Sequence, residues 1–156
     1  MDRFMEEVVV KRNKGINEVM FALSMVAMVL MAIMGMFYLQ VLLMQFSVTL
    51  LITTLIFIGG AVYLFLFRDR LRTEYEYTFT NGDMDFAKVY NNKKRKSLGS
   101  LKVSRVDAFG KVSSPAFQRY ISMPGVRKDN WFLNRGQELY YLYFQKESSK
   151  RVIIIE

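Results

Sequence analysis

The sequence predicts a membrane α-helical hairpin joined to a small, mostly antiparallel β domain. Residues 19–67 contain no charged side chain, and this run of 49 residues far exceeds the roughly 18 that indicate one membrane span. Beyond it, apolar and polar side chains alternate from Tyr75 onward, as in a half-buried strand. Asn81 and Gly82 then mark a hairpin turn. The predicted organisation is an N-terminal segment 1–18, a two-span hairpin 19–67 and a β domain 68–156.

The N-terminal segment has two interpretations. Its apolar residues Phe4, Met5, Val8 and Val9 recur at helical spacing, and Asp2 is placed to cap a helix. In the first interpretation, these features form a short helix that lies on the inner leaflet. The alternative is a frayed basic leader that only sets the topology of the membrane spans.

The uncharged run must fold back on itself, because one straight helix of that length would be about 74 Å long against a hydrocarbon core of about 30 Å. We place the spans at 19–39 and 46–67, with Gln40 and Gln45 bracketing a tight turn. Lysines and arginines flank the run on both sides but are absent from the turn. The positive-inside bias therefore predicts an integral protein of the cell membrane with both termini in the cytoplasm.

Small and hydroxyl-bearing residues let membrane helices approach closely. We expect such residues to pack the two helices of the hairpin together. They are Ser24, Gly35, Thr49, Thr53 and Gly60.

The β domain continues after the first hairpin with further strand patterns. The predicted strands are 83–90, 96–101, 106–109, 137–145 and 151–155. Polar, proline and glycine residues predict loops at 91–96, 113–115 and 124–125. The expected core includes Tyr77, Phe79, Val106, Leu142 and Ile154.

The order of these elements is similar to that of a known family. The stretch 75–86 with its Asn81 and Gly82 turn, the basic loop 93–96 and the stretch 100–110 resemble small bacterial pleckstrin-homology-like domains of membrane proteins. Over nearly its full length the chain resembles an uncharacterised, clostridial-type family of two-span membrane proteins that carry such a cytoplasmic domain of unknown function. The resemblance implies a sandwich or barrel of two orthogonal sheets, and it implies no known activity.

The composition excludes much catalytic chemistry. The chain has neither cysteine nor histidine, so it has no disulfide, thiolate nucleophile, Cys/His zinc site or histidine-based triad. Asp83 and Asp85 would share one face of a strand, where they could hold Mg²⁺, although two acids beside a turn are more simply a solvated strand edge. We expect a non-enzymatic protein without catalytic residues, metal or cofactor.

The charge balance indicates the working surface. Residues 68–156 contain 18 Lys+Arg against 10 Asp+Glu and so carry the whole net charge of +8. A domain tethered at the inner leaflet lies within reach of anionic lipid. The cations that we expect to contact lipid are Lys93, Lys94, Arg95 and Lys96, together with Arg68, Arg70 and Arg72. The simpler alternative for 93–96 is a solvated turn.

These observations predict a membrane-anchored adaptor whose partners are membrane lipids, with a protein partner or a second copy of the chain in addition. Nucleic acid is not expected as a partner, because alternation places most of the aromatic residues in the core. Two alternatives stay open. In the first, the chain is a module that binds an extended peptide along a sheet edge at 137–145. In the second, the chain is a subunit of a larger membrane complex.

Overall fold

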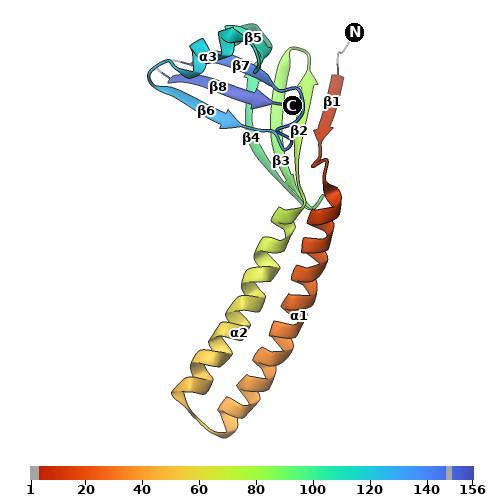
Figure 1. Ribbon diagram of the computed structural model, residues 1–156, viewed down its shortest axis with the longest axis vertical. Coiled ribbons are helices and arrows are strands. Elements are labelled where there is room, and N and C mark those ends of the chain that lie inside the picture. The colour runs from red at the N-terminus through yellow and green to blue at the C-terminus, as the bar shows by residue number, and fades with distance from the viewer. Residues whose placement is uncertain (1–3, 147–148) are drawn as a thin grey trace. The chain divides into compact units, whose positions relative to one another are not determined.

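The computed structural model describes residues 4–146 and 149–156, which form two compact units. The β unit contains the N-terminal residues up to Arg12 together with residues 73–156, and the helical unit contains residues 13–72. The helical unit is thus inserted in the sequence between two segments of the β unit (Figure 1).

The helical unit is a hairpin of α1 (Lys14–Met44) and α2 (Val48–Phe67), followed by the short 3₁₀ helix η1 (Arg68–Leu71). Both long helices have the length and apolar composition needed to cross a membrane. Helix α1 extends beyond the predicted span at both ends. At its C-terminal end no glycine, proline or charge interrupts the apolar run at Gln40. The connection between the helices shrinks accordingly to residues 45–47.

The first sheet of the β unit is an antiparallel sheet in the order β1-β2-β3-β4. Its strands are β1 (Phe4–Val9), β2 (Thr73–Thr80), β3 (Asp83–Tyr90) and β4 (Lys94–Lys102). Asn81 and Gly82 both have positive φ, 51° and 98°, as the predicted two-residue turn requires. The 3₁₀ helix η2 (Val103–Arg105) leads out of this sheet.

The N-terminal segment forms strand β1 and neither of the two predicted structures. Phe4 lies opposite Thr80 and Val9 opposite Tyr75 in an antiparallel pairing with β2. Hydrogen bonding to a strand far along the chain therefore overrides the helical spacing of the apolar residues. Asp2, the expected cap, lies outside the described residues.

The second sheet has the order β5-β7-β8-β6, in which β6 is parallel to β8 and the other pairs are antiparallel. Its strands are β5 (Ala108–Lys111), β6 (Val126–Asn130), β7 (Tyr140–Lys146) and β8 (Ser149–Ile155). Helix α3 (Pro115–Ile121) connects β5 to β6. Neither α3 nor β6 was predicted from the sequence. The helix is only 7 residues long, and β6 is too charged to show an apolar alternation.

Two buried clusters lie on opposite faces of the second sheet. The first lies between the sheets and contains Tyr77, Phe86 and Leu142. The second lies under α3 and contains Phe117 and Tyr141. Successive residues of β7 and β8 alternate between the two clusters, so both strands are buried on both faces. The β unit therefore has three layers, namely the first sheet, the second sheet and α3.

The predicted core is correct except at one position. Tyr77, Leu142 and Ile154 are buried, and Val106 packs against the first cluster. Phe79 is only partly buried. It lies opposite Met5, which is 71% exposed, so this end of the first sheet is open to solvent.

Candidate functional site

Both connections to the helical unit leave from the same end of the first sheet. Strand β1 ends at Val9, and β2 begins at Thr73. In the register of the sheet, Val9 lies opposite Tyr75, Tyr75 opposite Lys88, and Lys88 opposite Lys96. These residues form one row across the four strands, so Lys96 lies level with the point at which β1 ends.

A side-chain amide holds the segment between β1 and α1. The Asn134 Oδ1 accepts a hydrogen bond from the Arg12 backbone N–H at 2.8 Å, and its Nδ2 donates to the Val10 carbonyl at 2.9 Å and to Glu156 Oε1 at 2.7 Å. Glu156 Oε2 accepts the backbone N–H of Asn134 at 3.0 Å. This clamp fixes the following loop residue, Arg135, beside the segment that enters the helical unit.

A buried tyrosine connects the clamp to the core. The Tyr77 hydroxyl donates a hydrogen bond to the Trp131 carbonyl and accepts one from the Glu156 backbone N–H at 3.4 Å. Burial is the main cause that raises the pKa of the Tyr77 phenol far above its ordinary value. The hydroxyl therefore keeps its proton at physiological pH and acts as a fixed donor.

The turn between β3 and β4 projects from the same end of the sheet. This turn is three residues long, 91–93. Asn91 and Asn92 have φ of 50° and 52°, as at the two central positions of a type I′ turn, and the Lys93 N–H donates to the Tyr90 carbonyl at 3.0 Å. We name this end of the first sheet, together with the segments beside it, the basic end. Its cations are Lys11, Arg12, Lys93, Lys94, Arg95, Lys96 and Arg135.

The predicted loop 91–96 is shorter in the structure, because β4 begins at Lys94 and only Lys93 of the four predicted cations lies in the turn. The four cations are also not equivalent. Arg95 forms an ion pair with Glu76 at 2.8 Å, and the Glu76 side chain is only 17% exposed. Much of the Arg95 charge is therefore offset. Lys93, Lys94 and Lys96 are exposed and make no ion pair within residues 4–146 and 149–156. Arg135 was not predicted as part of this surface, because only the clamp, which joins distant segments, brings it to this end.

The three predicted arginines that follow α2 belong to the helical unit, not to the unit that holds the lysines of the turn. Each lies over an aromatic ring of its own unit, a geometry that favours a cation. The pairs are Arg68 with Phe65, Arg70 with Phe67 and Arg72 with Phe21, at 4.9, 4.2 and 3.8 Å from the ring centroids. Arg72 also forms an ion pair with Glu18, so it is held in place by two kinds of contact.

Two of the small residues predicted to pack the hairpin lie against the opposite helix. A Cβ atom at Gly35 would lie 2.8 Å from Ile58 Cγ1, and one at Gly60 would lie 2.7 Å from Met31 Sδ. Both distances are below the closest normal contacts of a Cβ atom. These glycines therefore allow the helices to approach closely.

The hydroxyl-bearing residues of the hairpin differ from the glycines. Ser24 and Thr53 are partly buried, Thr49 is exposed, and the buried hydroxyl is that of Thr54, which donates to the Leu50 carbonyl at 2.8 Å. The less exposed positions of α2 include 50, 54, 57, 61 and 64, at the alternating spacing of three and four typical of antiparallel helix pairs. Nothing in the sequence of α2 marks these positions, because apolar residues also occupy nearly all of the others.

Asp83 and Asp85 do not belong to a larger cluster of metal-binding side chains within the described residues. No group of three or more His, Cys, Asp or Glu side chains occurs in residues 4–146 and 149–156. Asp83 and Asp85 line an open cleft of about 640 Å³ that also contains Lys102 and Arg105. Asp85 in addition accepts a hydrogen bond from Ser100. The two cations oppose the binding of Mg²⁺ in this cleft.

The predicted peptide-binding edge at 137–145 is wrong. Strand β7 pairs with β5 through Tyr140–Tyr143 and with β8 along its whole length, so it lies inside the second sheet. Just before the start of β5, Asp107 Oδ2 accepts a hydrogen bond from the Gln145 backbone N–H at 3.0 Å. The aromatic residues that suggested an exposed edge instead fill the two clusters on either side of the sheet.

Comparison with protein families gives a match to the family described as Bacterial PH-like domain (DUF6106) over residues 1–156. Comparison with the curated proteins gives no match, and comparison with the solved structures gives none. The family match spans the entire sequence and agrees with the two sheets and the two apolar helices of the fold. The resemblance to pleckstrin-homology-like domains is confirmed, and the chain belongs to the bacterial PH-like domain family DUF6106.

Proposed function

We propose that the chain is a non-enzymatic, membrane-anchored adaptor whose basic end lies against the anionic inner leaflet of the cell membrane. The observation that carries this proposal is the register of the first sheet. Thr73 lies opposite Tyr90, and Tyr90 opposite Lys94. The basic turn is therefore two strand spacings, about 10 Å, from the residue at which the chain returns from the helical unit.

The same topology supports placing both termini in the cytoplasm. Strands β1 and β2 flank the helical hairpin in sequence, yet they pair with each other over six positions. The two ends of the hairpin must then be on one side of the membrane. Basic residues occur before α1 and after α2 but not between the helices, and this distribution is typical of the cytoplasmic side.

Three exposed lysines, Lys93 in the turn and Lys94 and Lys96 at the start of β4, can supply a useful attraction. Each cation near an anionic leaflet contributes about 1 kcal/mol, so three contribute about 3 kcal/mol, or roughly a hundredfold preference for the lipid surface. The attraction falls off within about 8 Å at physiological ionic strength. Arg95 is left out of this sum because Glu76 offsets its charge. The rest of the β unit then faces the cytoplasm, where a protein partner or a second copy of the chain can bind.

The experiment uses the full chain in nanodiscs. The chain has no cysteine, so a fluorophore can be attached at a single Ser97→Cys substitution beside the turn, with spin-labelled lipids as quenchers. We expect quenching in nanodiscs that contain anionic lipid, less quenching in neutral nanodiscs, and less as salt rises. A fluorophore at Thr80→Cys, at the opposite end of β2, should show little quenching in any of them.

Charge reversal separates this proposal from a solvated turn. Replacing Lys93, Lys94 and Lys96 by Glu should abolish the quenching at position 97 while leaving the Arg95 and Glu76 pair intact. The matched control replaces Lys102, Arg105 and Lys128 by Glu. These three exposed cations lie outside the basic end, so the net charge changes by the same amount. If both triple variants are quenched as strongly as the parent, the basic end does not bind lipid.

A further inference from the structure

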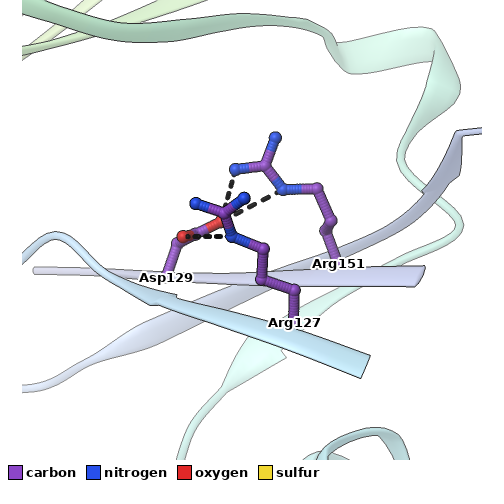
Figure 2. A network of polar contacts seen from close by, with 3 residues as sticks. All are labelled: Arg127, Asp129 and Arg151. Carbon is purple, nitrogen blue, oxygen red and sulfur yellow. Dashed lines mark hydrogen bonds and ion pairs between the residues drawn. The ribbon is translucent and has the colours of Figure 1, made fainter. Parts of the chain in front are cut away.

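A second group of cations lies at the starts of β6 and β8. The Asp129 carboxylate is shared by two arginines. Arg127 Nε donates to Asp129 Oδ1 at 3.2 Å, and Arg151 Nε and Nη2 both donate to Oδ2, the former at 3.1 Å. Figure 2 shows the two guanidinium groups converging on this one carboxylate. The Asp129 side chain is 11% exposed, that of Arg151 27% and that of Arg127 72%.

One carboxylate does not balance this group. Arg127 and Arg151 lie directly opposite each other in the parallel pairing of β6 with β8, and like charges in such positions repel. Lys128 and Lys150 are the sequence neighbours of these arginines in the two strands, so they project from the opposite face of the sheet. In the described parts of the chain no second carboxylate pairs with either arginine. The structure thus retains a repulsion that a bound anion would relieve.

The unused donors suit an oxyanion. Within residues 4–146 and 149–156, Arg127 contacts Asp129 only through Nε, which leaves both of its Nη groups available, and Arg151 retains Nη1. Guanidinium groups bind phosphate through several N–H donors at once, and a phosphate offers three oxygens to two guanidinium groups that are not coplanar. Asp129 holds both guanidinium groups in position before an anion arrives.

The location favours a ligand from the aqueous phase over a lipid headgroup. Arg151 lies five residues before Glu156, which belongs to the clamp beside the basic end. Along an extended strand this separation is about 17 Å, roughly twice the screening length of about 8 Å. The Arg151 guanidinium also lies 5.8 Å from the ring of Phe144, which lines the cleft of about 640 Å³. A cleft of this volume can take the organic part of a small molecule.

We propose that Arg127 and Arg151, oriented by Asp129, bind the phosphate group of a water-soluble phosphorylated small molecule. This site is separate from the basic end and does not depend on lipid contact. It gives the adaptor a second ligand on the part of the β unit away from its connections to the membrane helices.

Inorganic phosphate is the probe, added to the full chain in neutral nanodiscs at constant ionic strength. We expect saturable shifts of the arginine Nε–H resonances of Arg127 and Arg151 in NMR spectra, absent when chloride replaces phosphate. Arg127→Gln should weaken binding about tenfold or more, because it removes a charged, multiply bonded donor. Arg127→Lys should also weaken it, since lysine keeps the charge without the planar fork.

The matched control is Arg119→Gln, which removes the same charge from an exposed position on α3 and should leave phosphate affinity unchanged. Unfolding followed by Trp131 fluorescence checks that each variant is folded. The proposal is overturned if phosphate shifts neither arginine, or if Arg127→Gln binds as tightly as the parent. It is also overturned if the same resonances shift on incorporation of phosphatidic acid without added phosphate, which would identify a lipid headgroup as the ligand.

Discussion

The clamp at Asn134 allows a quantitative test of how the β unit holds the segment that leads into the membrane helices. Asn134→Ala removes three hydrogen bonds, namely those to the Arg12 N–H, the Val10 carbonyl and Glu156 Oε1. A neutral hydrogen bond contributes about 0.5 to 1.5 kcal/mol net, and one to a charged group about 1.5 to 3 kcal/mol. Asn134 is only half-buried, so water can replace part of the lost hydrogen bonding in the variant. We expect a loss of about 2 to 3 kcal/mol in the free energy of unfolding of the β unit.

The assay is urea unfolding of the full chain in detergent, followed by tryptophan fluorescence. Trp131 is the single tryptophan of the sequence, it is buried, and its ring centroid lies 4.8 Å from that of Phe86. The fluorescence therefore reports on the core of the β unit without a signal from the helices. Hydrogen exchange of the Arg12 amide should also become faster in Asn134→Ala, because the amide loses its acceptor.

Two further variants test the geometry of the clamp. Asn134→Asp keeps the acceptor for the Arg12 N–H but loses the donor to Val10 and adds a charge beside Glu156. We expect it to be at least as unstable as Asn134→Ala at neutral pH and to recover when the carboxylates are protonated. Gln137→Ala, an exposed change in the same loop, serves as the control. A loss below about 0.5 kcal/mol for Asn134→Ala, with unchanged Arg12 exchange, would refute the reasoning.

The remaining predictions concern the core, the hairpin and the buried phenol. Phe86→Ala, at a side chain that is 1% exposed, should cost about 3 to 5 kcal/mol, whereas Phe79→Ala at the open end of the sheet should cost about half of that or less; Trp131 fluorescence in urea measures both. Gly35→Val should weaken helix packing by about 1 to 3 kcal/mol, seen as earlier loss of energy transfer between dyes on the two helices during titration with sodium dodecyl sulfate. Tyr77→Phe should cost about 1 to 3 kcal/mol near neutral pH, because it leaves a buried carbonyl unpaired.

The Tyr77 variant also has a pH dependence whose sign follows from the raised pKa of the phenol. The unfolded chain ionises this group near its ordinary pKa of about 10, while the folded chain retains the proton to higher pH. The stability that the parent gains from the protonated Tyr77 hydroxyl is complete below pH 10 and declines as pH rises above 10. The difference in the free energy of unfolding between the parent and Tyr77→Phe should therefore become smaller in urea titrations at alkaline pH. A difference that becomes larger above pH 10 would contradict this prediction.

The hairpin and core predictions have equally direct controls. Gly59→Val places the same side chain where no atom lies within 4 Å of the added Cβ, so it should leave helix packing unchanged. Equal effects of the Gly35 and Gly59 substitutions would show that the close approach at Gly35 does not stabilise the hairpin. Equal losses for Phe86→Ala and Phe79→Ala would show that the end of the sheet near Phe79 is closed in solution.

Several features could be predicted because local chemistry decides them. The absence of charge over 49 residues indicated the two apolar helices, since ionised groups are costly in hydrocarbon. Asn81 and Gly82 tolerate positive φ and so marked the first hairpin turn. The basic residues of the β3–β4 turn were also identified from the sequence, although their unequal availability depends on the contact between Arg95 and Glu76.

Other features depended on pairings between distant segments. Strand β1 was predicted as a helix or a leader, because its partner in β2 lies beyond the whole hairpin and its own spacing fits a helix equally well. The strand at 137–145 resembled an exposed edge because nothing local shows that the short β5 pairs with it. Thr54 was missed because α2 is apolar on all of its faces, so only the packing against α1 shows which face is buried.

The sequence by itself determined the apolar hairpin, its basic flanks, the turns built on asparagine and glycine, and the lack of cysteine and histidine chemistry. These properties belong to single residues or short segments, and their solvation or backbone preferences act wherever the chain goes. Only the tertiary structure decided that the N-terminal segment completes the first sheet, that Asn134 clamps the entry to the helices, and that Arg127 and Arg151 share one carboxylate. Each of these depends on contacts between residues far apart in sequence, whose energy arises only when the strands have paired.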